Sequence, residues 1–208
     1  MEALPRLIVI TDWSLPREQV FSAVAAIAPL GPAVGVQLRA PDAGGRRLWE
    51  DGRRLLGLLR PHGASLFVNG RLDVALALGA HLHLPSTGLS VEEVRPHLPS
   101  GCRVSVAIHP GEEVRARGAE LALVSPVWSP GSKPVDTRPP LGPEGFFSLA
   151  ARLPCPAFAL GGVTAERVPL LGGRAQGVAV VSAVLAAPSP RDAASALLEA
   201  LDPRPPSA

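Results

Sequence analysis

The sequence predicts a single-domain (β/α)8 barrel, or TIM barrel, and three observations support this fold class. Eight short runs rich in β-forming residues recur along the 208 residues. Segments of helical pattern alternate with them, and strands that alternate with helices form a parallel sheet. No shift in composition marks an internal domain boundary. An open doubly wound sheet of six or seven units is the alternative, but eight units in about 200 residues fit the short end of the barrel class.

The eight expected strands share a short, β-rich composition. They are Leu7–Ile10, Val34–Leu38, Ser65–Val68, His81–Leu84, Val104–Ile108, Leu121–Ser125, Ala157–Leu160 and Val178–Val181. The expected helices are Pro16–Ala28, Gly45–Leu59, Arg71–Leu78, Ser90–His97, Glu112–Arg117, Glu144–Arg152, Ala165–Leu171 and Pro190–Leu201. The barrel should therefore span residues 1–201, and the proline-rich segment 202–208 should be a disordered tail.

Composition and charge exclude several classes of function. The chain has 20 Lys and Arg against 18 Asp and Glu, which does not suit a general nucleic-acid binder. Its most apolar stretch, Val20–Val36, contains Pro29, Gly31 and Pro32 and is shorter than the ~20 residues of a membrane span. We therefore expect a cytoplasmic protein that binds neither nucleic acid nor membrane. The sequence leaves the oligomeric state open, a homo-oligomer included.

The fifth expected strand indicates where chemistry could take place. Side chains alternate between the two faces of a barrel strand, so Ser105 and Ala107 should point inward and the branched residues outward. His109 then lies at the carboxyl end of that strand, the end at which barrel enzymes keep their active sites. An imidazole at this place is a candidate functional group. A structural histidine is the alternative.

The loops after the last two expected strands have the pattern of a phosphate site. Gly161-Gly162 follows the seventh strand, and Val181-Ser182 ends the eighth. Barrels commonly bind phosphate in these loops through backbone N–H groups, and paired glycines let the backbone approach the ligand. The alternative is that Gly161-Gly162 forms only a tight turn. The position after the seventh strand favours phosphate.

Three further side chains are candidates for binding an anionic substrate. Lys133 is the only lysine in the chain and lies in a long loop after the sixth strand. Its compact ammonium suits a phosphate as a point charge, although a solvated loop lysine is the alternative. Arg39 and Asn69 follow the second and third strands. Either could bind substrate or stabilise its own loop.

A metal site is not expected. His81 and His83 share one face of the fourth strand and His109 ends the fifth, but no Cys, Asp or Glu at a nearby strand end would complete a zinc or iron site. We interpret His83 instead as a hydrogen-bonded lining residue.

These positions resemble the thiamin phosphate synthase superfamily over nearly the whole chain. The matching segments are Ile10-Thr11-Asp12, Gln37-Leu38-Arg39, Asn69, His83-Leu84, Lys133-Pro134, Gly161-Gly162-Val163 and 177–183. The resemblance implies a (β/α)8 barrel whose last two loops hold a thiazole phosphate. Synthases typically carry Arg-Glu-Lys, Asn-Asp-Arg and acidic residues after the fourth strand. Here these places read Arg39-Ala40-Pro41, Asn69-Gly70-Arg71 and Leu84-Pro85-Ser86-Thr87, so both carboxylates that would hold magnesium are absent.

The departures resemble the TenI branch, the thiazole tautomerases of thiamin biosynthesis. Asn69-Gly70-Arg71, Leu84-Pro85-Ser86 and His109-Pro110-Gly111-Glu112-Glu113 are similar to that branch. The resemblance implies an isomerase that needs no cofactor and shifts a proton in a carboxylated thiazole phosphate. It implies that His109 transfers the proton. Gly161, Gly162, Val181 and Ser182 would anchor the phosphate, with Arg39, Asn69 and Lys133 near the substrate's negative charges.

Two other functions stay open. One is thiamin phosphate synthase, which joins a pyrimidine pyrophosphate to a thiazole phosphate. The other is a barrel that binds a phosphate metabolite and regulates through protein contacts without turnover. The tautomerase is the hypothesis that the sequence favours.

Overall fold

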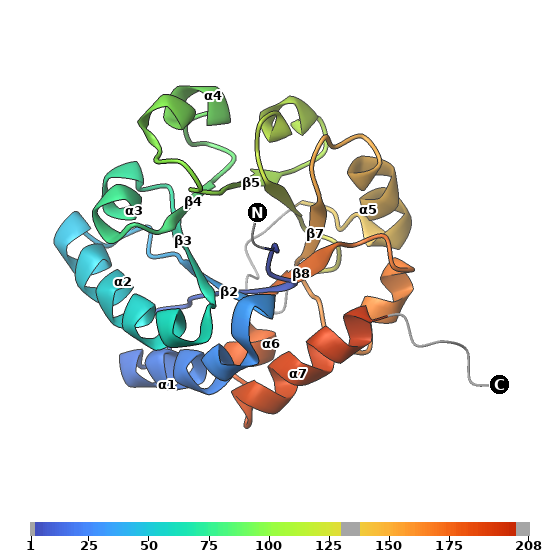
Figure 1. The fold of residues 1–208 in the computed structure, drawn as a ribbon. Helices are drawn as coiled ribbons and strands as arrows, with labels where there is room; N and C mark the ends of the chain where they lie inside the picture. The colour runs from blue at the N-terminus through green and yellow to red at the C-terminus, as the bar shows by residue number, and fades with distance from the viewer. Residues whose placement is uncertain (1–2, 130–137, 203–208) are drawn as a thin grey trace.

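The computed structural model describes residues 3–129 and 138–202, which form a closed barrel of eight parallel strands in sequential order. Helices surround the barrel as an outer ring (Figure 1). β1 pairs with β8 through Leu7 and Val178, which closes the sheet. The strands are β1 Leu7–Ile10, β2 Val34–Leu38, β3 Ser65–Asn69, β4 His81–Leu84, β5 Val104–Ile108, β6 Leu121–Val124, β7 Ala157–Leu160 and β8 Gly177–Val180. The predicted fold class is confirmed, and the open sheet is excluded.

Not all connections between the strands are regular α-helices. The α-helices are α1 Arg17–Ile27, α2 Gly45–Leu59, α3 Leu72–Leu78, α4 Val91–Val94, α5 Gly142–Ala150, α6 Ser182–Leu185 and α7 Pro190–Leu201. The 3₁₀ segments are η1 Ala28–Ala33, η2 Arg60–His62, η3 Arg95–His97, η4 Glu113–Ala116 and η5 Val168–Leu171. The helices predicted after β5 and β7 are therefore only the 3₁₀ turns η4 and η5. Gly172, at a left-handed φ of 55°, ends η5 after four residues.

The helix predicted at Ser90–His97 is also shorter than expected. Ser90 caps it with the predicted capping box, in which its side chain accepts from the Glu93 backbone and Glu93 accepts from the Ser90 backbone. Pro96 has no N–H to donate to the carbonyl four residues earlier. The regular helix therefore stops at Val94, and the chain continues as η3.

Two apolar layers lie on the two faces of the barrel wall. The outer layer packs the strands against the helices and contains Val104, Val106 and Ile108 of β5. The inner layer fills the barrel and is made of Ile8, Ile10, Phe67, Leu121, Leu123, Phe158 and Ala179. The predicted orientation of β5 is confirmed, because its branched residues face the helices and Ser105 bonds to a side chain of the adjacent strand inside the barrel.

One glycine makes room for one of the two phenylalanine side chains of the inner layer. Phe158 is fully buried and lies beside Gly177 of the neighbouring strand β8. A Cβ atom added at Gly177 would overlap the Phe158 ring and the carbonyl oxygen of Arg6. The absence of a side chain at this position therefore lets the aromatic ring fill the barrel.

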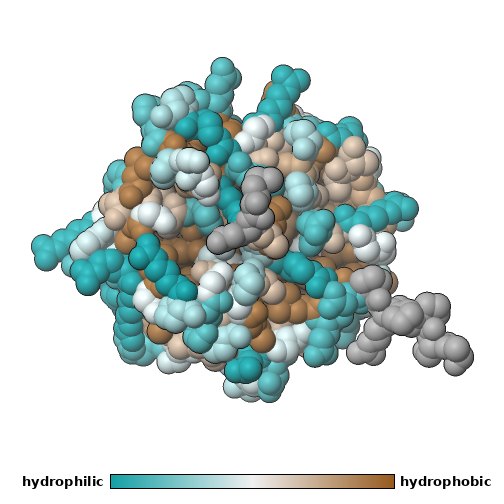
Figure 2. All heavy atoms as spheres, viewed as in Figure 1, coloured by the Kyte–Doolittle hydropathy of each residue, from teal (hydrophilic) through white to brown (hydrophobic). Residues whose placement is uncertain are grey.

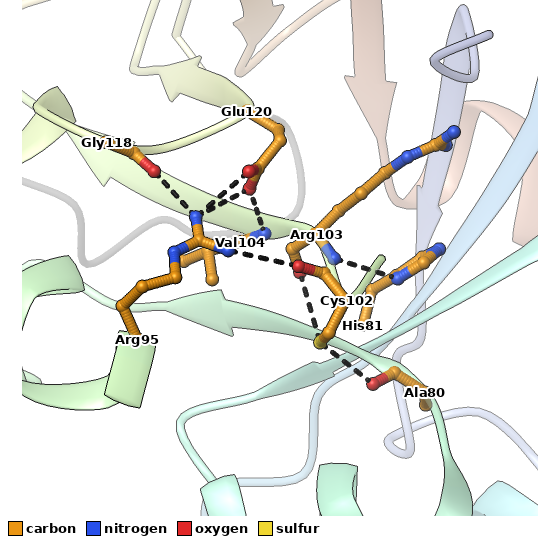
Figure 3. Close-up of polar contacts among 8 residues, drawn as sticks. All are labelled: Ala80, His81, Arg95, Cys102, Arg103, Val104, Gly118 and Glu120. Carbon is orange, nitrogen blue, oxygen red and sulfur yellow. Dashed lines mark hydrogen bonds and ion pairs between the residues drawn. The ribbon is translucent and has the colours of Figure 1, made fainter. Parts of the chain in front are cut away.

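A polar cluster joins the amino-terminal ends of β4, β5 and β6 (Figure 3). The Arg95 guanidinium donates to the carbonyl oxygens of Cys102 and Gly118 at 3.1 and 2.6 Å, and it pairs with Glu120 at 2.9 Å. Glu120 also accepts from the backbone N–H of Val104 at 2.6 Å. Arg95 thus links η3 to the starts of two strands.

His81 belongs to this end of the barrel. Its Nδ1 accepts from the backbone N–H of Arg103 at 3.2 Å (Figure 3). His81 begins β4, whereas His83 approaches the opposite, carboxyl end of the same strand. The two imidazoles therefore lie toward opposite ends of the barrel.

The surface seen in Figure 2 carries many hydrophilic side chains along the outer edge of the helix ring, with hydrophobic side chains between them. Among the described residues, every helix is too short or too polar to cross a bilayer. The Asp202 carboxylate, just after α7, forms an ion pair with the Arg6 guanidinium, just before β1, at an N–O distance of 2.6 Å. The rest of the predicted tail, residues 203–208, lies outside the described residues.

Candidate active site

A cavity of about 1010 Å³ opens at the carboxyl-terminal ends of the barrel strands. Its floor is built by one inward-facing residue from each strand. These residues are Ile10, Gln37, Asn69, His83, Ala107, Leu123, Leu160 and Ala179. The apolar members come mainly from β6, β7, β8 and β1, and the polar members come from β2, β3 and β4. The floor therefore has an apolar half and a polar half.

Gln37 and His83 form the buried polar part of the floor. Gln37 is 2% exposed, and its Nε2 has no hydrogen-bond acceptor among the described residues. His83 is also buried, and its Nδ1 lies 2.8 Å from Oγ of Ser105. Burial, and secondarily the charge of Arg39, lowers the pKa of His83 to about 3. The cavity thus presents an unpaired amide N–H and a neutral imidazole.

The ends of β1 and β2 are braced by a reciprocal contact. Thr11 Oγ1 accepts from the backbone N–H of Arg39 at 2.9 Å and donates to the Arg39 carbonyl at 3.2 Å. Arg39 lines the cavity and forms no ion pair with any described residue. These two hydrogen bonds therefore fix the backbone of Arg39, whose side chain lines the cavity.

The two glycines after β7 are required by their backbone and by their neighbours. Gly161 and Gly162 have φ values of 96° and 61°. A Cβ atom on Gly162 would lie 2.7 Å from the Ser129 carbonyl oxygen and 2.8 Å from Cβ of Trp128. The Gly161 carbonyl accepts from the Trp128 backbone N–H at 3.0 Å, which joins this loop to the loop after β6. The tight-turn interpretation is therefore compatible with the phosphate interpretation.

Residues of this loop and of the loop after β8 line the same cavity. Gly162, Val163, Ser182 and Ala183 all line it. Within the described part of the chain, their N–H groups donate no hydrogen bond to another residue. Unpaired N–H groups on neighbouring loops suit an anion such as a phosphate.

His109 lies in the cavity wall with both ring nitrogens engaged. Its Nδ1 lies 2.6 Å from the Ser125 carbonyl oxygen, an acceptor, so Nδ1 carries the proton. Its Nε2 contacts the Arg138 guanidinium, a donor, so Nε2 is the acceptor. Glu112 also accepts from the His109 backbone N–H at 3.1 Å. Both ring nitrogens and the backbone N–H of His109 thus have polar partners.

Seven of the eight candidate site residues from the sequence line this single cavity. They are Arg39, Asn69, His109, Gly161, Gly162, Val181 and Ser182. Lys133 lies outside the described residues. The sequence interpretation did not assign a role to Gln37 or Arg138. Strand alternation could have indicated Gln37, because it lies two residues before Arg39. Nothing in the sequence around Arg138 indicates that it contacts His109.

The carboxylates that line the cavity are those of Asp12, Asp42 and Asp51, and among the described residues they do not form a cation site. Asp12 accepts from the Ser14 backbone and hydroxyl at 3.0 and 2.7 Å. Asp51 is 2% exposed and is bound by Arg17 and Arg47. Among the described residues, no three His, Cys, Asp or Glu side chains are grouped so that they could hold a metal ion. The three candidate histidines and these carboxylates are therefore dispersed.

Comparison with known proteins gives several relatives along the whole chain. A thiamine-phosphate synthase of Salinispora tropica is 37% identical over 207 residues, covering 97% of this chain and 99% of the relative. A thiamine-phosphate synthase of Azorhizobium caulinodans is 35% identical over 196 residues, covering 92% of each chain. A solved thiamine phosphate pyrophosphorylase from Pyrococcus furiosus is 28% identical, with a TM-score of 0.79 and coverage of 94% and 95%.

These relatives correct the function predicted from the sequence. The thiazole tautomerase hypothesis is wrong, because the relatives at 34–37% identity are named thiamine-phosphate synthase and therefore indicate a transferase rather than an isomerase. The hypothesis gave great weight to three short segments at strand ends, including His109-Pro110-Gly111-Glu112-Glu113. Both ring nitrogens of His109 already have partners in the described structure. The sequence alone does not show these contacts.

The family assignment rests on most of the chain rather than on single motifs. The profile of the family described as thiamine monophosphate synthase matches residues 7–184. This range begins at the first residue of β1 and ends within α6, so it includes all eight strands and both loops after β7 and β8. The chain therefore belongs to the thiamine monophosphate synthase family.

Proposed function

We propose that this protein is a transferase of thiamin biosynthesis that joins a pyrimidine pyrophosphate to a thiazole phosphate. The observation that carries the proposal is the likeness to thiamine-phosphate synthases over more than nine-tenths of the chain. The cavity at the carboxyl ends of the strands offers glycine-rich loops, a polar half of the floor and arginine side chains, which are features that two phosphorylated heteroaromatic substrates would need.

The thiazole phosphate would bind with its phosphate at the loops after β7 and β8. The N–H groups of Gly162 and Val163 and those of Ser182 and Ala183 line the cavity without internal acceptors. The Ser182 side chain adds a hydroxyl donor. Because the two loops are adjacent through the pairing of β7 and β8, their donors can converge on one phosphate.

The pyrimidine would bind over the polar half of the floor. The Gln37 amide has an unpaired N–H in a buried position, which is costly unless a ligand accepts it. His83 stays neutral beside it because its pKa is lowered to about 3. The pyrimidine would present a ring nitrogen as an acceptor and an amino group as a donor. These groups are complementary to the Gln37 amide and the neutral His83 imidazole.

The reaction requires one bond to form and one to break. The thiazole nitrogen supplies an electron pair to the methylene carbon of the pyrimidine, and a C–N bond forms. The C–O bond between that carbon and the diphosphate breaks, and its electron pair leaves with pyrophosphate. The protein's contribution is to position the two rings and to stabilise the negative charge on the leaving group.

The magnesium site expected of a synthase does not fit the described residues. Asn69-Gly70 and Pro85-Ser86 stand where a synthase would carry carboxylates, and Asp12 and Asp51 are engaged by other groups. Asp42 also lines the cavity, but no two further described ligands are grouped with it. No step of the proposed reaction is therefore assigned to a metal ion. The positive charge on the cavity wall comes from arginine side chains.

A direct assay tests the proposal. The purified protein is incubated with thiazole phosphate and pyrimidine pyrophosphate, with and without magnesium, and thiamin phosphate and pyrophosphate are quantified by mass spectrometry. We expect equimolar products, with the rate falling about 10- to 100-fold in Arg39→Gln because a charge-assisted contact is lost. Arg46→Gln is the matched control, since Arg46 is 92% exposed and lies outside the cavity. Absence of thiamin phosphate under all conditions would contradict the proposal.

A further inference from the structure

Two successive peptide groups of the loop after β7 have their carbonyl oxygens held by groups outside the cavity. The Gly161 carbonyl accepts from the backbone N–H of Trp128 at 3.0 Å. The Gly162 carbonyl accepts from Nη1 of Arg167 at 2.6 Å. Gly161 and Gly162 line the cavity, whereas Trp128 and Arg167 do not. The carbonyl sides of both peptides are therefore turned away from a ligand in the cavity.

These carbonyl contacts determine where the next two N–H groups point. Both peptides are trans, and in a planar trans peptide the C=O and the following N–H point in opposite directions. The N–H of Gly162 therefore points away from Trp128, and the N–H of Val163 points away from Arg167. Gly162 and Val163 line the cavity, and their N–H groups have no acceptor among the described residues. Two adjacent donors are thus left for a ligand.

The chain after the glycines brings Arg167 back to them. The backbone N–H groups of Arg167 and Val168 both donate to the Thr164 carbonyl, at 3.0 and 3.1 Å. This turn leaves the Arg167 side chain beside Gly162, five residues earlier. The guanidinium carbon also lies 5.7 Å from the centre of the Trp128 ring, within the range of a cation–π contact. The guanidinium thus contacts the loop after β6 and holds the loop after β7.

The contact between Arg167 and the Gly162 carbonyl is close and charge-assisted. A Cβ atom on Gly162 would lie 3.1 Å from Nη1 of Arg167 and 2.8 Å from Cβ of Trp128, so no side chain could stand between these groups. A hydrogen bond from a charged donor is stronger than one between neutral groups. It also polarises the peptide that accepts it, and the N–H at the other end of that peptide becomes a better donor. Here that N–H belongs to Val163.

We propose that Arg167, held against Trp128, is a positioning residue that turns the peptide between Gly162 and Val163 so that its N–H faces the phosphate group of thiazole phosphate. The inference rests on the proposed transferase function and adds to it a residue that does not itself touch a substrate. In that proposal the loop after β7 binds only one of the two substrates. The effect of Arg167 is therefore confined to thiazole phosphate and does not extend to pyrimidine pyrophosphate.

Steady-state kinetics of two Arg167 variants test this selectivity. Arg167→Met keeps an apolar chain without a donor, whereas Arg167→Lys keeps a charged donor. We expect Arg167→Met to raise the KM for thiazole phosphate by about tenfold and to leave the KM for pyrimidine pyrophosphate within about twofold. Arg167→Lys should restore the KM for thiazole phosphate to within about threefold of the wild type. Equal increases of both KM values in Arg167→Met, or no increase of either, would overturn the inference.

Arg60→Met is the matched control. Arg60 is also exposed, and its Nη2 donates to the backbone carbonyl of Leu78 at 3.3 Å, but it does not line the cavity. Both KM values should equal those of the wild type in this variant. Thermal melting of all three variants shows whether each is folded, so that a general loss of structure is recognised.

Binding of thiazole phosphate alone separates this inference from the transferase proposal. In the wild-type protein, the amide proton resonances of Gly162 and Val163 should move downfield as thiazole phosphate is titrated, and calorimetry gives its affinity. In Arg167→Met the affinity should fall about tenfold. Binding that depends on Arg167, without thiamin phosphate formation under any condition, would support the inference and overturn the transferase. Unmoved Gly162 and Val163 resonances in a wild-type protein that forms thiamin phosphate would overturn the inference alone.

Discussion

The Nδ1 atom of His83 lies 2.8 Å from the Oγ atom of Ser105, and both side chains are buried in the barrel wall. Ser105→Ala would leave the buried imidazole nitrogen without this partner. We expect the free energy of unfolding to fall by about 1–3 kcal/mol, measured by urea denaturation. Ser100→Ala, on the surface, is the control and should change stability by less than about 0.5 kcal/mol. Equal stability of the two variants would contradict the prediction.

The same histidine predicts a pH dependence of stability. Burial lowers the pKa of His83 to about 3 in the folded protein, whereas the unfolded chain has a pKa near ~6.5. As pH falls below that value, the unfolded chain takes up a proton that the folded protein does not. The His83 contribution therefore lowers the free energy of unfolding by up to ~1.4 kcal/mol per pH unit between the two pKa values.

Two measurements check the pH prediction. The imidazole proton resonances of His83 should not shift as the folded protein is taken from neutral pH to pH ~5, because the titration lies below this range. In urea denaturation, stability should depend less steeply on acid pH in His83→Gln than in the wild type. A titration of the His83 resonances near pH ~6.5 would show that the imidazole is solvated rather than buried.

Gly162 should tolerate no side chain. Its φ is 61°, and a Cβ atom would lie 2.7 Å from the Ser129 carbonyl oxygen. We expect Gly162→Ala to displace the loop after β7 and to raise the KM for thiazole phosphate by about tenfold or more. Gly173→Ala is the matched control, because Gly173 has a similar φ of 69° but nothing within 4 Å of the added atom. The control should lose about 1 kcal/mol of stability through backbone strain, with KM unchanged.

Gly177→Ala should weaken the barrel itself. The added methyl group would overlap the Phe158 ring and the carbonyl oxygen of Arg6. We expect a loss of about 1–3 kcal/mol or more in the free energy of unfolding. Gly57→Ala, in the exposed part of α2 with nothing within 4 Å, should instead gain about 0.5–1 kcal/mol. Calorimetric melting measures both, and a Gly177→Ala protein as stable as the wild type would refute the packing argument.

The sequence predicted the strands better than the helices, for a physical reason. A buried strand is specified by a short run such as Val104–Ile108, and its alternation of inward and outward side chains does not depend on the neighbouring sequence. The connection before β8 depends instead on where a helix can end. Gly172 stops it after one turn, so the expected Ala165–Leu171 helix is only η5. Helical pattern without the length to form several turns yields a 3₁₀ segment.

The sequence could predict the site residues that lie at strand ends. It could not predict the contacts of residues that lie within long loops. Arg39 and Asn69 each lie at the end of a strand, so the barrel topology alone brings them together. Arg138 is far along a connection, and its contact with His109 depends on how that connection folds. The contacts of His109 were unpredictable for the same reason. A sequence displays an imidazole, but it does not display which atoms its two nitrogens already contact.

The Arg95–Glu120 cluster lies at the opposite rim from the cavity, among the starts of β4, β5 and β6. Substitutions that fortify or loosen that rim have no direct contact with bound substrates. Under the proposed function, heat tolerance near Arg95 and substrate preference near Arg39 could therefore be adjusted as separate traits. Natural substitutions at the amino-terminal rim can likewise accumulate without changing the residues that line the cavity.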